Sequence, residues 1–277
     1  MAQYSRALEP RTEWARPFEK FWEAHRTAIT RTVAVGLFLA LWEWAVRGGG
    51  VNPLFLAGPI RVFERLYQVF ADGSIWPHFW ASGRVAGLGF VIAIAIGVPL
   101  GILMGRFRTV RDVLEPFVIA KYSIPTVVFL PLFVMWFGIG MWFKVMLVIV
   151  GTVFVIIINT EAGVSNVDRR LIETAKSFCA NEFEILLKIV APASLPFIIA
   201  GIRLGIGRVL IAVVVAEGFA ATAGLGYLAF QAGAAYDTAQ VFVAAILLGA
   251  VAITLNSGLR TLERRLAPWK ESDTERG

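Results

Sequence analysis

Six stretches of the chain are apolar over the length that a helix needs to cross a bilayer, which is about 20 residues at 1.5 Å per residue. They cover residues 28–46, 82–104, 117–137, 142–159, a segment within 195–223, and 239–259. Residues 72–80 and 224–237 lie between them and have the composition of loops or re-entrant segments. The pattern predicts an all-α protein, a polytopic membrane helix bundle with about six transmembrane helices.

The ends of the chain are more polar than its middle. Residues 1–27 are of mixed charge and contain aromatic residues at helical spacing, which predicts an interfacial helix on the cytoplasmic side: Trp14, Phe18, Phe21 and Trp22. The transmembrane domain is expected over 28–261, and a cytoplasmic tail over 262–277. The first apolar stretch is the weakest of the six because Glu43 interrupts it.

The segment 161–193 is too charged to span a bilayer, yet its apolar residues keep helical spacing. Ser165 with Asp168, and Asn181 with Glu184, predict two N-terminal capping boxes. The expected apolar faces are Leu171, Ala175, Phe178 and Cys179 in the first helix, then Phe183, Leu186, Leu187 and Val190 in the second, which Pro192 and Pro196 should end. A helical hairpin of this kind suits either docking to a protein or lying on lipid.

Composition and charge agree with a membrane protein. Hydrophobic residues make up 57% of the chain, and 26 glycines raise the apolar share to about 66%, against about 45–50% in soluble domains. The net charge is +6, and the basic residues are unevenly distributed between the loops. If the N-terminus is inside, eighteen Lys and Arg residues lie on the inner side of the membrane and three lie on the outer side. This asymmetry predicts a multi-pass inner-membrane protein with both termini in the cytoplasm, and no nucleic-acid partner.

Several kinds of enzyme are excluded by the residues present. The single cysteine, Cys179, cannot form an intrachain disulfide or a cysteine-cluster metal site. His25 and His78 lack the spacing of a zinc hydrolase. No glycine is followed by lysine, so the chain has no Walker A loop and any ATP must be bound by another chain. We therefore expect no catalytic residues and no cofactor or metal on this chain.

Charged residues within the spans are the candidates for function, since such charges are costly in a bilayer. Glu217 is the deepest and should either pair with a basic residue and close the outer end of the bundle or line the pathway. Arg208 and Lys121 are further pathway or gate candidates, although Lys121 is close enough to the inner face to reach it.

Motifs in the hairpin resemble the EAA loop of ABC importer permeases. Glu173, Ala175, Ile189 and Pro192 match that loop at the correct spacing, whereas Thr174, Cys179 and Ala191 replace an alanine, a glycine and a leucine. The resemblance to the nitrate, sulfonate and taurine branch extends over about residues 53–269, through segments 131–133, 136–140, 159–160, 163–164, 201–203, 216–217, 224–226 and 262–265.

This resemblance implies a type I importer permease fold with cytoplasmic coupling helices. The residues that would contact the ATPase are Glu173, Thr174, Ala175, Phe178, Cys179, Ile189 and Pro192. The implied partners are a second copy of the permease, two cytoplasmic ATPase subunits that carry ATP and Mg²⁺, and an external solute-binding protein. The implied activity is inward movement of a small organic anion or oxyanion, such as a sulfonate, taurine or nitrate, by alternating access.

Alternatives stay open at this point. The same motifs occur in permeases for riboflavin or pyrimidine-type cofactor precursors. A secondary transporter or channel that works alone would show inverted repeats and an ion site at the membrane midplane, and no convincing repeat is found. A scaffold without transport would leave the charged hairpin unexplained.

Overall fold

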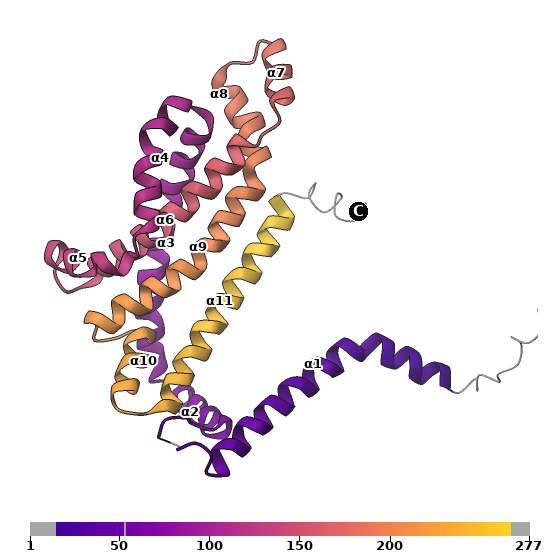
Figure 1. Ribbon diagram of the computed structural model, residues 1–277, viewed down its shortest axis with the longest axis vertical. Helices are drawn as coiled ribbons and strands as arrows, with labels where there is room; N and C mark the ends of the chain where they lie inside the picture. Colours follow the sequence, from indigo (N-terminus) through magenta and orange to yellow (C-terminus); the bar gives the residue numbers. More distant parts are fainter. Residues whose placement is uncertain (1–14, 53, 267–277) are drawn as a thin grey trace, which may run out of the picture. The chain divides into compact units, whose positions relative to one another are not determined.

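The computed structural model describes residues 15–52 and 54–266, with the backbone only at 15–26, 28 and 266. Within these ranges every regular element is helical (Figure 1). The chain forms two compact units, one reaching to Phe63 and the other beginning at Glu64. The long helices are α1 (Ala15–Arg47), α3 (Ile75–Arg106), α6 (Met141–Ser165), α9 (Ala191–Ala220) and α11 (Thr238–Leu266), and the shorter ones are α2 (Pro59–Ala71), α4 (Arg108–Ser123), α5 (Leu130–Phe137), α7 (Arg169–Ser177), α8 (Glu182–Ile185) and α10 (Leu225–Ala234).

In the first unit, α1 runs without a break through the predicted boundary at residue 27. Its span-like part is Ile29–Arg47, close to the predicted 28–46. Glu43 is tolerated there because it forms an ion pair with Arg47 at 2.5 Å and accepts a hydrogen bond from the Ile60 backbone N–H at 3.3 Å. The aromatic face predicted for the N-terminal segment (Trp14, Phe18, Phe21 and Trp22) lies outside the residues whose side chains are described.

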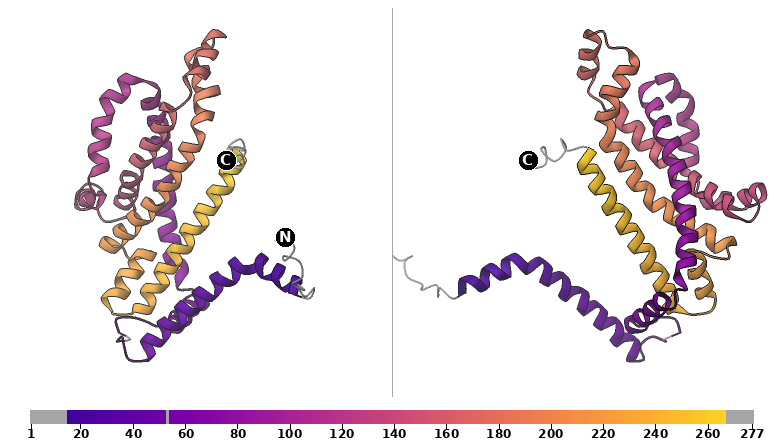
Figure 2. Two further views of the ribbon diagram at one scale, coloured as in Figure 1. Left: turned by 45° about the vertical axis from the view of Figure 1, so that its right-hand side comes forward. Right: turned by 180° about the vertical axis from the view of Figure 1, so that it is seen from behind.

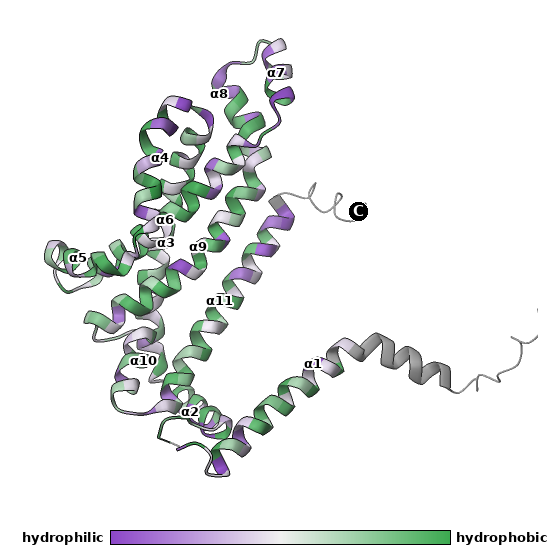
Figure 3. Ribbon diagram, viewed as in Figure 1, coloured by the Kyte–Doolittle hydropathy of each residue, from purple (hydrophilic) through white to green (hydrophobic). Residues whose placement is uncertain are grey.

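The predicted number of spans is confirmed within one. Among the described residues, five helical stretches are long and apolar enough to cross a bilayer, and a sixth exists if one bent pair counts as a span. Apolar residues cover the long helices, and polar residues gather toward their ends and at α7 (Figure 3). Many large apolar side chains on these helices are exposed, as expected for surfaces that meet lipid or another chain.

The third span is not the continuous helix predicted over 117–137. The helix α4 ends at Ser123, a short 3₁₀ turn follows over Thr126–Phe129, and the two halves meet at 92°. Pro125 explains the break, since a residue before proline is forced toward extended backbone and proline has no N–H to donate. Ile124 accordingly has φ −85° and ψ 125°.

The core of the second unit is α6, which packs between α3 and α9. Its buried side chains form clusters with both neighbours, and the helices run side by side in Figure 1 and in both views of Figure 2. The approach to α3 is close: a Cβ added at Gly101 would lie 2.6 Å from Thr160 Cβ, and one at Gly97 would lie 2.9 Å from Ile156. The glycine spacing at 97, 101 and 105 therefore serves helix contact, whereas Gly83 and Gly87 meet nothing within 4 Å.

Two segments predicted as loops or re-entrant segments are partly helical, and one predicted helix end is wrong. The helix α3 begins at Ile75, inside 72–80, and α10 occupies most of 224–237. Pro192 and Pro196 do not end the second hairpin helix, because a π-helical segment over Leu186–Val190 runs directly into α9. Pro192 directly follows the π-helical segment, where the regular i to i−4 hydrogen-bond pattern is already interrupted.

Candidate functional site

The hairpin formed by α7 and α8 lies at one end of the second unit, opposite α10 (Figure 1). The Asp168 side chain caps α7 by accepting a hydrogen bond from the Arg170 backbone N–H at 2.9 Å. The capping box predicted for Ser165 and Asp168 is therefore wrong, because Ser165 is the last residue of α6. The box of Asn181 and Glu184 is confirmed, with reciprocal hydrogen bonds of 2.9 and 3.1 Å at the start of α8.

A tight turn joins the two hairpin helices at Cys179. Its φ of 57° lies in the left-handed region, where the EAA pattern has glycine. The Ala180 N–H donates to the Ala175 carbonyl, and the Cys179 N–H donates to the Lys176 carbonyl, which is the hydrogen-bond pattern of a Schellman motif. The turn thus keeps the glycine-type geometry although cysteine occupies the position.

The inside of the hairpin differs from the predicted apolar faces. Ala175, Ile185 and Val190 are buried together with Val164 at the end of α6, and Ile189 packs against this cluster. The predicted faces grouped Phe178 with Ala175 and Phe183 with Val190, but both phenylalanines point away from it. Phe178 is the C-cap residue of α7, already outside regular helical backbone, and the π-helical segment Leu186–Val190 changes the 3.6-residue register between Phe183 and Val190.

The outside of the hairpin carries four exposed apolar side chains among charged ones. Phe178 is 83% exposed and Phe183 is 68% exposed, and Leu171 and Leu187 are each half exposed or more. Of the predicted coupling residues, Glu173, Thr174, Cys179 and Pro192 are also exposed, whereas Ala175 is buried. Apolar side chains so exposed on a charged element are typical of a surface that binds another protein.

Ion pairs connect the hairpin to the ends of the long helices. Glu182 pairs with Lys176 at 3.3 Å and with Arg106, the last residue of α3. Arg111 of α4 pairs with Glu161 of α6 at 3.1 Å and donates to the Met104 and Gly105 carbonyls at the end of α3. Glu182 therefore ties the hairpin to the end of α3, and Arg111 ties the ends of α3, α4 and α6 to one another.

Glu217 is fully buried near the opposite end of α9. Its carboxylate accepts hydrogen bonds from Ser82 Oγ at 2.8 and 2.9 Å and from the Gly226 backbone N–H at 2.9 Å. Ser82 Oγ in turn accepts from the Leu225 N–H at 2.8 Å. Glu217 forms no ion pair within 4.0 Å among the described residues, although Lys144 is near enough to attract its charge, and its hydrogen bonds go to the start of α10 and to a serine of α3. It lines none of the described cavities.

Lys121 and Arg208 come together at the break in the third span. Lys121 Nζ donates to Thr126 Oγ1 at 3.1 Å and lies 5.3 Å and 5.2 Å from the ring centroids of Phe129 and Phe154. Arg208 lies over the Tyr122 ring at 5.8 Å. Thr126 and Arg208 both line a cavity of about 260 Å³ whose other walls are apolar: Pro125, Val127, Leu147, Gly151, Ile211, Ala212 and Val215. Neither cation forms an ion pair with a described residue.

The sequence singled out Lys121 and Arg208 separately, as charges within spans, and could not place them beside each other. Ser82 and His78, which bind the Glu217 turn, carried no signal because a serine and a histidine near a span end are unremarkable in sequence. Among the described residues, no group of three His, Cys, Asp or Glu side chains could hold a metal ion.

Residues 97–271 match the family described as the binding-protein-dependent transport system inner membrane component. The taurine transport system permease protein TauC of Escherichia coli is 33% identical, with 90% of this chain and 92% of the relative covered. The putative aliphatic sulfonates transport permease protein SsuC of Bacillus subtilis is 30% identical over 85% and 86%. The riboflavin transport system permease protein RibX of Chloroflexus aurantiacus is 32% identical over 88% and 91%.

A solved structure of the MetNI methionine ABC transporter in an inward-facing conformation has the same fold. The TM-score is 0.63 at 18% identity, over 71% of this chain and 99% of the solved chain. The all-α bundle and the resemblance seen in the EAA-like segment are thereby confirmed. The chain belongs to the binding-protein-dependent inner-membrane components, the permease subunits of ABC importers.

Proposed function

We propose that this permease acts as a homodimer that imports a small organic anion of the sulfonate type, driven by two separate ATPase subunits and supplied by an external solute-binding protein. The proposal has a coupling part, which concerns the hairpin, and a substrate part, which concerns the cavity beside Arg208. The hairpin end faces the cytoplasm in this arrangement, as the eighteen inner basic residues favour.

The coupling part is supported by the exposed face of the hairpin. Phe178, Phe183, Leu171 and Leu187 present apolar surface to a partner, and Glu173 and Thr174 add polar contacts. Because Glu182 and Arg111 connect this end to α3, α4 and α6, closure of an ATPase dimer around the hairpins would move these helices as a body. The chain itself then needs no nucleotide site.

The substrate part rests on one observation, the meeting of Lys121 and Arg208 at the broken span. Two cations without a carboxylate partner, next to a largely apolar cavity, favour an anion with a short apolar body. Relatives named for taurine and aliphatic sulfonates support this class. A riboflavin or pyrimidine precursor has no need of two unpaired cations.

Uptake by proteoliposomes tests the substrate. The permease is reconstituted with the ATPase and binding protein encoded by neighbouring genes, and ATP-dependent uptake of taurine, ethanesulfonate and riboflavin is compared. We expect sulfonate uptake, and about a tenfold or greater rise in KM in Arg208→Gln, because a charge-assisted contact is lost. The matched control is Arg108→Gln, since Arg108 lies at the far end of α4 and its side chain is 93% exposed. Riboflavin uptake without sulfonate uptake, or uptake without ATP, would contradict the proposal.

A second experiment tests the hairpin. Phe178→Asp places a charge on the exposed face without disturbing the buried cluster around Ala175, so the chain should fold but bind the ATPase at least about tenfold more weakly. Phe178→Leu keeps an apolar side chain and should restore binding. Normal co-purification and normal uptake in Phe178→Asp would show that this face does not contact the ATPase.

A further inference from the structure

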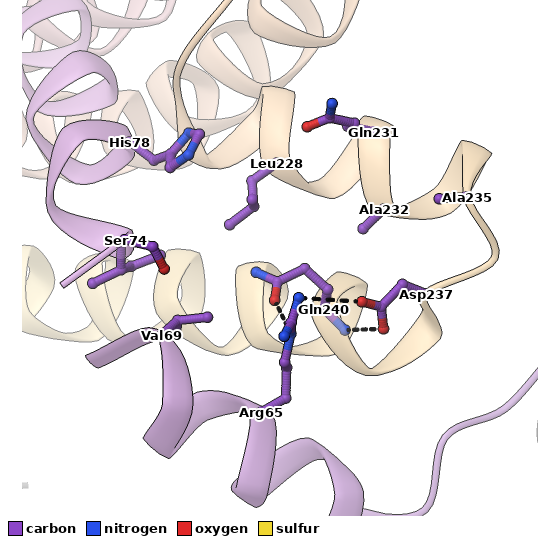
Figure 4. Close-up of a pocket in the computed structure, with 11 residues that line it drawn as sticks. Arg65, Val69, Ser74, His78, Leu228, Gln231, Ala232, Ala235, Asp237 and Gln240 are labelled. Atoms are coloured by element: carbon purple, nitrogen blue, oxygen red, sulfur yellow. Dashed lines mark hydrogen bonds and ion pairs between the residues drawn. The ribbon is translucent and has the colours of Figure 1, made fainter. Parts of the chain in front are cut away.

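A second cavity, of about 300 Å³, lies at the end of the bundle opposite the hairpin (Figure 4). It is enclosed by the last turns of α2, the start of α3, the α10 helix and the start of α11. Apolar residues form part of the wall, and polar side chains converge on it from several elements: Arg65, Ser74, His78, Gln231, Asp237 and Gln240. No sequence pattern predicts a role for this group of residues.

The orientation of Gln240 is determined by its neighbours. Arg65 Nε donates to Gln240 Oε1 at 2.7 Å, and the Arg65 guanidinium lies 3.5 Å from Asp237 Oδ2. Because arginine can only donate, the oxygen of the Gln240 amide must face it and the nitrogen must face away. Arg65 and Asp237 compensate each other's charge, so the pair leaves the cavity close to neutral.

The Gln240 amide nitrogen lacks a partner as a result. Gln240 is 3% exposed, its Nε2 is buried, and that atom forms no hydrogen bond with any described residue. In Figure 4 it points away from Asp237, toward the space between Ser74 and Leu228. A buried donor without an acceptor costs about 1–3 kcal/mol, so the site calls for an acceptor from outside the chain.

His78 supplies a second hydrogen-bond donor, because the contact made by one of its ring nitrogens determines which nitrogen carries the proton. Its Nδ1 accepts a hydrogen bond from the Gly224 backbone N–H at 3.1 Å, and its ring stacks on Tyr227 with centroids 6.0 Å apart. When Nδ1 of a neutral imidazole accepts, the proton resides on Nε2. His78 therefore offers an Nε2–H donor, and the ring is held in place by the stack and by the turn before α10.

We propose that this cavity binds a small oxyanion, a sulfonate or carboxylate with a short apolar chain, through Gln240 Nε2 and His78 Nε2. The oxyanion supplies the missing acceptors, and Val69, Ile75 and Leu228 surround its apolar part. The site is separate from the cavity beside Arg208. Its use as a reception site for arriving solute rests on the proposed function and orientation, whereas the binding itself does not.

Binding is measured on the full chain in lipid nanodiscs by calorimetry with ethanesulfonate, and with ethyl methyl sulfone as an uncharged analogue. The chain has two histidines, so a His25→Gln background leaves His78 as the single imidazole signal in ¹⁵N NMR. We expect saturable ethanesulfonate binding that shifts the His78 Nε2 resonance, and about tenfold or weaker binding of the sulfone.

Two variants perturb the cavity in different ways. Gln240→Glu keeps the acceptor for Arg65 but puts an anionic oxygen where the unpaired donor was, and Leu228→Trp fills the space without altering a polar group. Each should weaken binding about tenfold or more. The matched control is Gln68→Glu, which adds the same charge beside the same arginine, at its other face and outside the cavity lining.

The site is refuted by absence of saturable binding to the unmodified chain up to about 10 mM, by an unmoved His78 resonance, or by equal weakening in Gln68→Glu. Sulfonate uptake by the assembled importer with no binding at this cavity would refute the inference and leave the proposed function intact. Binding here without uptake of any sulfonate would refute the proposed function and leave the inference intact.

Discussion

Glu217 and Gly224 belong to one contact, although they lie in two motifs seven residues apart. Gly224 has φ 139°, a left-handed value, and an added Cβ there would collide with the Glu217 carboxylate. The carboxylate occupies that space in order to accept from Gly226 N–H and Ser82 Oγ. The Ala216-Glu217 and Gly224-Leu225-Gly226 motifs are therefore explained by a single capped turn at the start of α10.

Removal of this acceptor should destabilise the fold. We expect Glu217→Ala to lower the free energy of unfolding by about 2–4 kcal/mol, because the Gly226 N–H and the Ser82 hydroxyl both remain buried without their partner. Denaturant titration of the purified chain in detergent measures this. Glu64→Ala, a change at an exposed glutamate, serves as the control and should stay within about 0.5 kcal/mol. Equal values for the two variants would refute the role of the turn.

Replacement of Cys179 by glycine is expected to stabilise the turn between α7 and α8. A non-glycine residue in the left-handed region, such as Cys179, costs about 1–2 kcal/mol. Glycine avoids this cost, but it loses more conformational entropy on folding, which offsets part of the stabilisation. Cys179→Gly should therefore slow hydrogen exchange at the Ala180 amide by a few-fold, since the turn opens less often. Cys179→Ala loses the thiol but keeps the strained φ, so it should show no such slowing. A similar effect of both variants would attribute the change to the thiol.

At the scale of elements, the bundle is organised by the approach of α3 to α6 and by the break between α4 and α5. The first follows from glycines at every fourth position, which the sequence displays. The break between α4 and α5 follows from Pro125, but the angle of the break does not. A proline predicts a kink, and only the packing of α5 against α6 decides that the chain turns by 92°. That turn is what brings Thr126, the hydrogen-bond acceptor of Lys121, to the cavity beside Arg208.

The glycine contact can be tested by one methyl group. Gly101→Ala would place Cβ 2.6 Å from Thr160 Cβ and 2.8 Å from the Ile157 carbonyl oxygen, and neither atom is the end of a flexible side chain. We expect a loss of about 1–3 kcal/mol in unfolding free energy from forced separation of α3 and α6. In the same helix, Gly87→Ala meets nothing within 4 Å and should be neutral or slightly stabilising. Destabilisation by Gly87→Ala alone would contradict this packing.

At the scale of the molecule, the second unit has a hairpin with exposed apolar side chains at one end and a capped turn with a polar cavity at the other, joined by long helices. Such a subunit should convert motion but perform no hydrolysis. We expect the purified permease to hydrolyse no ATP above background, and ATPase activity to appear when the ATPase subunits are added. A phosphate-release assay with and without those subunits measures this. Turnover by the permease alone would overturn the division of labour.

The sequence alone determined the class of this protein: the length and number of apolar stretches, the basic residues on one side and the EAA-like spacing are properties of single segments. Capping by Asn181 could likewise be predicted, because it depends on residues close in the chain, whereas the glycine spacing does not tell Gly97 and Gly101, which contact α6, from Gly83 and Gly87, which meet nothing within 4 Å. The faces of the hairpin helices could not, since α7 ends before Phe178 and a π-helical segment shifts the register between Phe183 and Val190.

Only the tertiary structure decided which distant residues meet. Glu217 forms its hydrogen bonds with Ser82 and the start of α10, Lys121 and Arg208 share one corner of the bundle, and Gln240 is left with an unpaired donor beside His78. The physical reason is that hydrogen bonding and charge compensation inside a bundle depend on the relative rotation and bending of helices. Those quantities are set by packing across the whole molecule, and local sequence does not carry them.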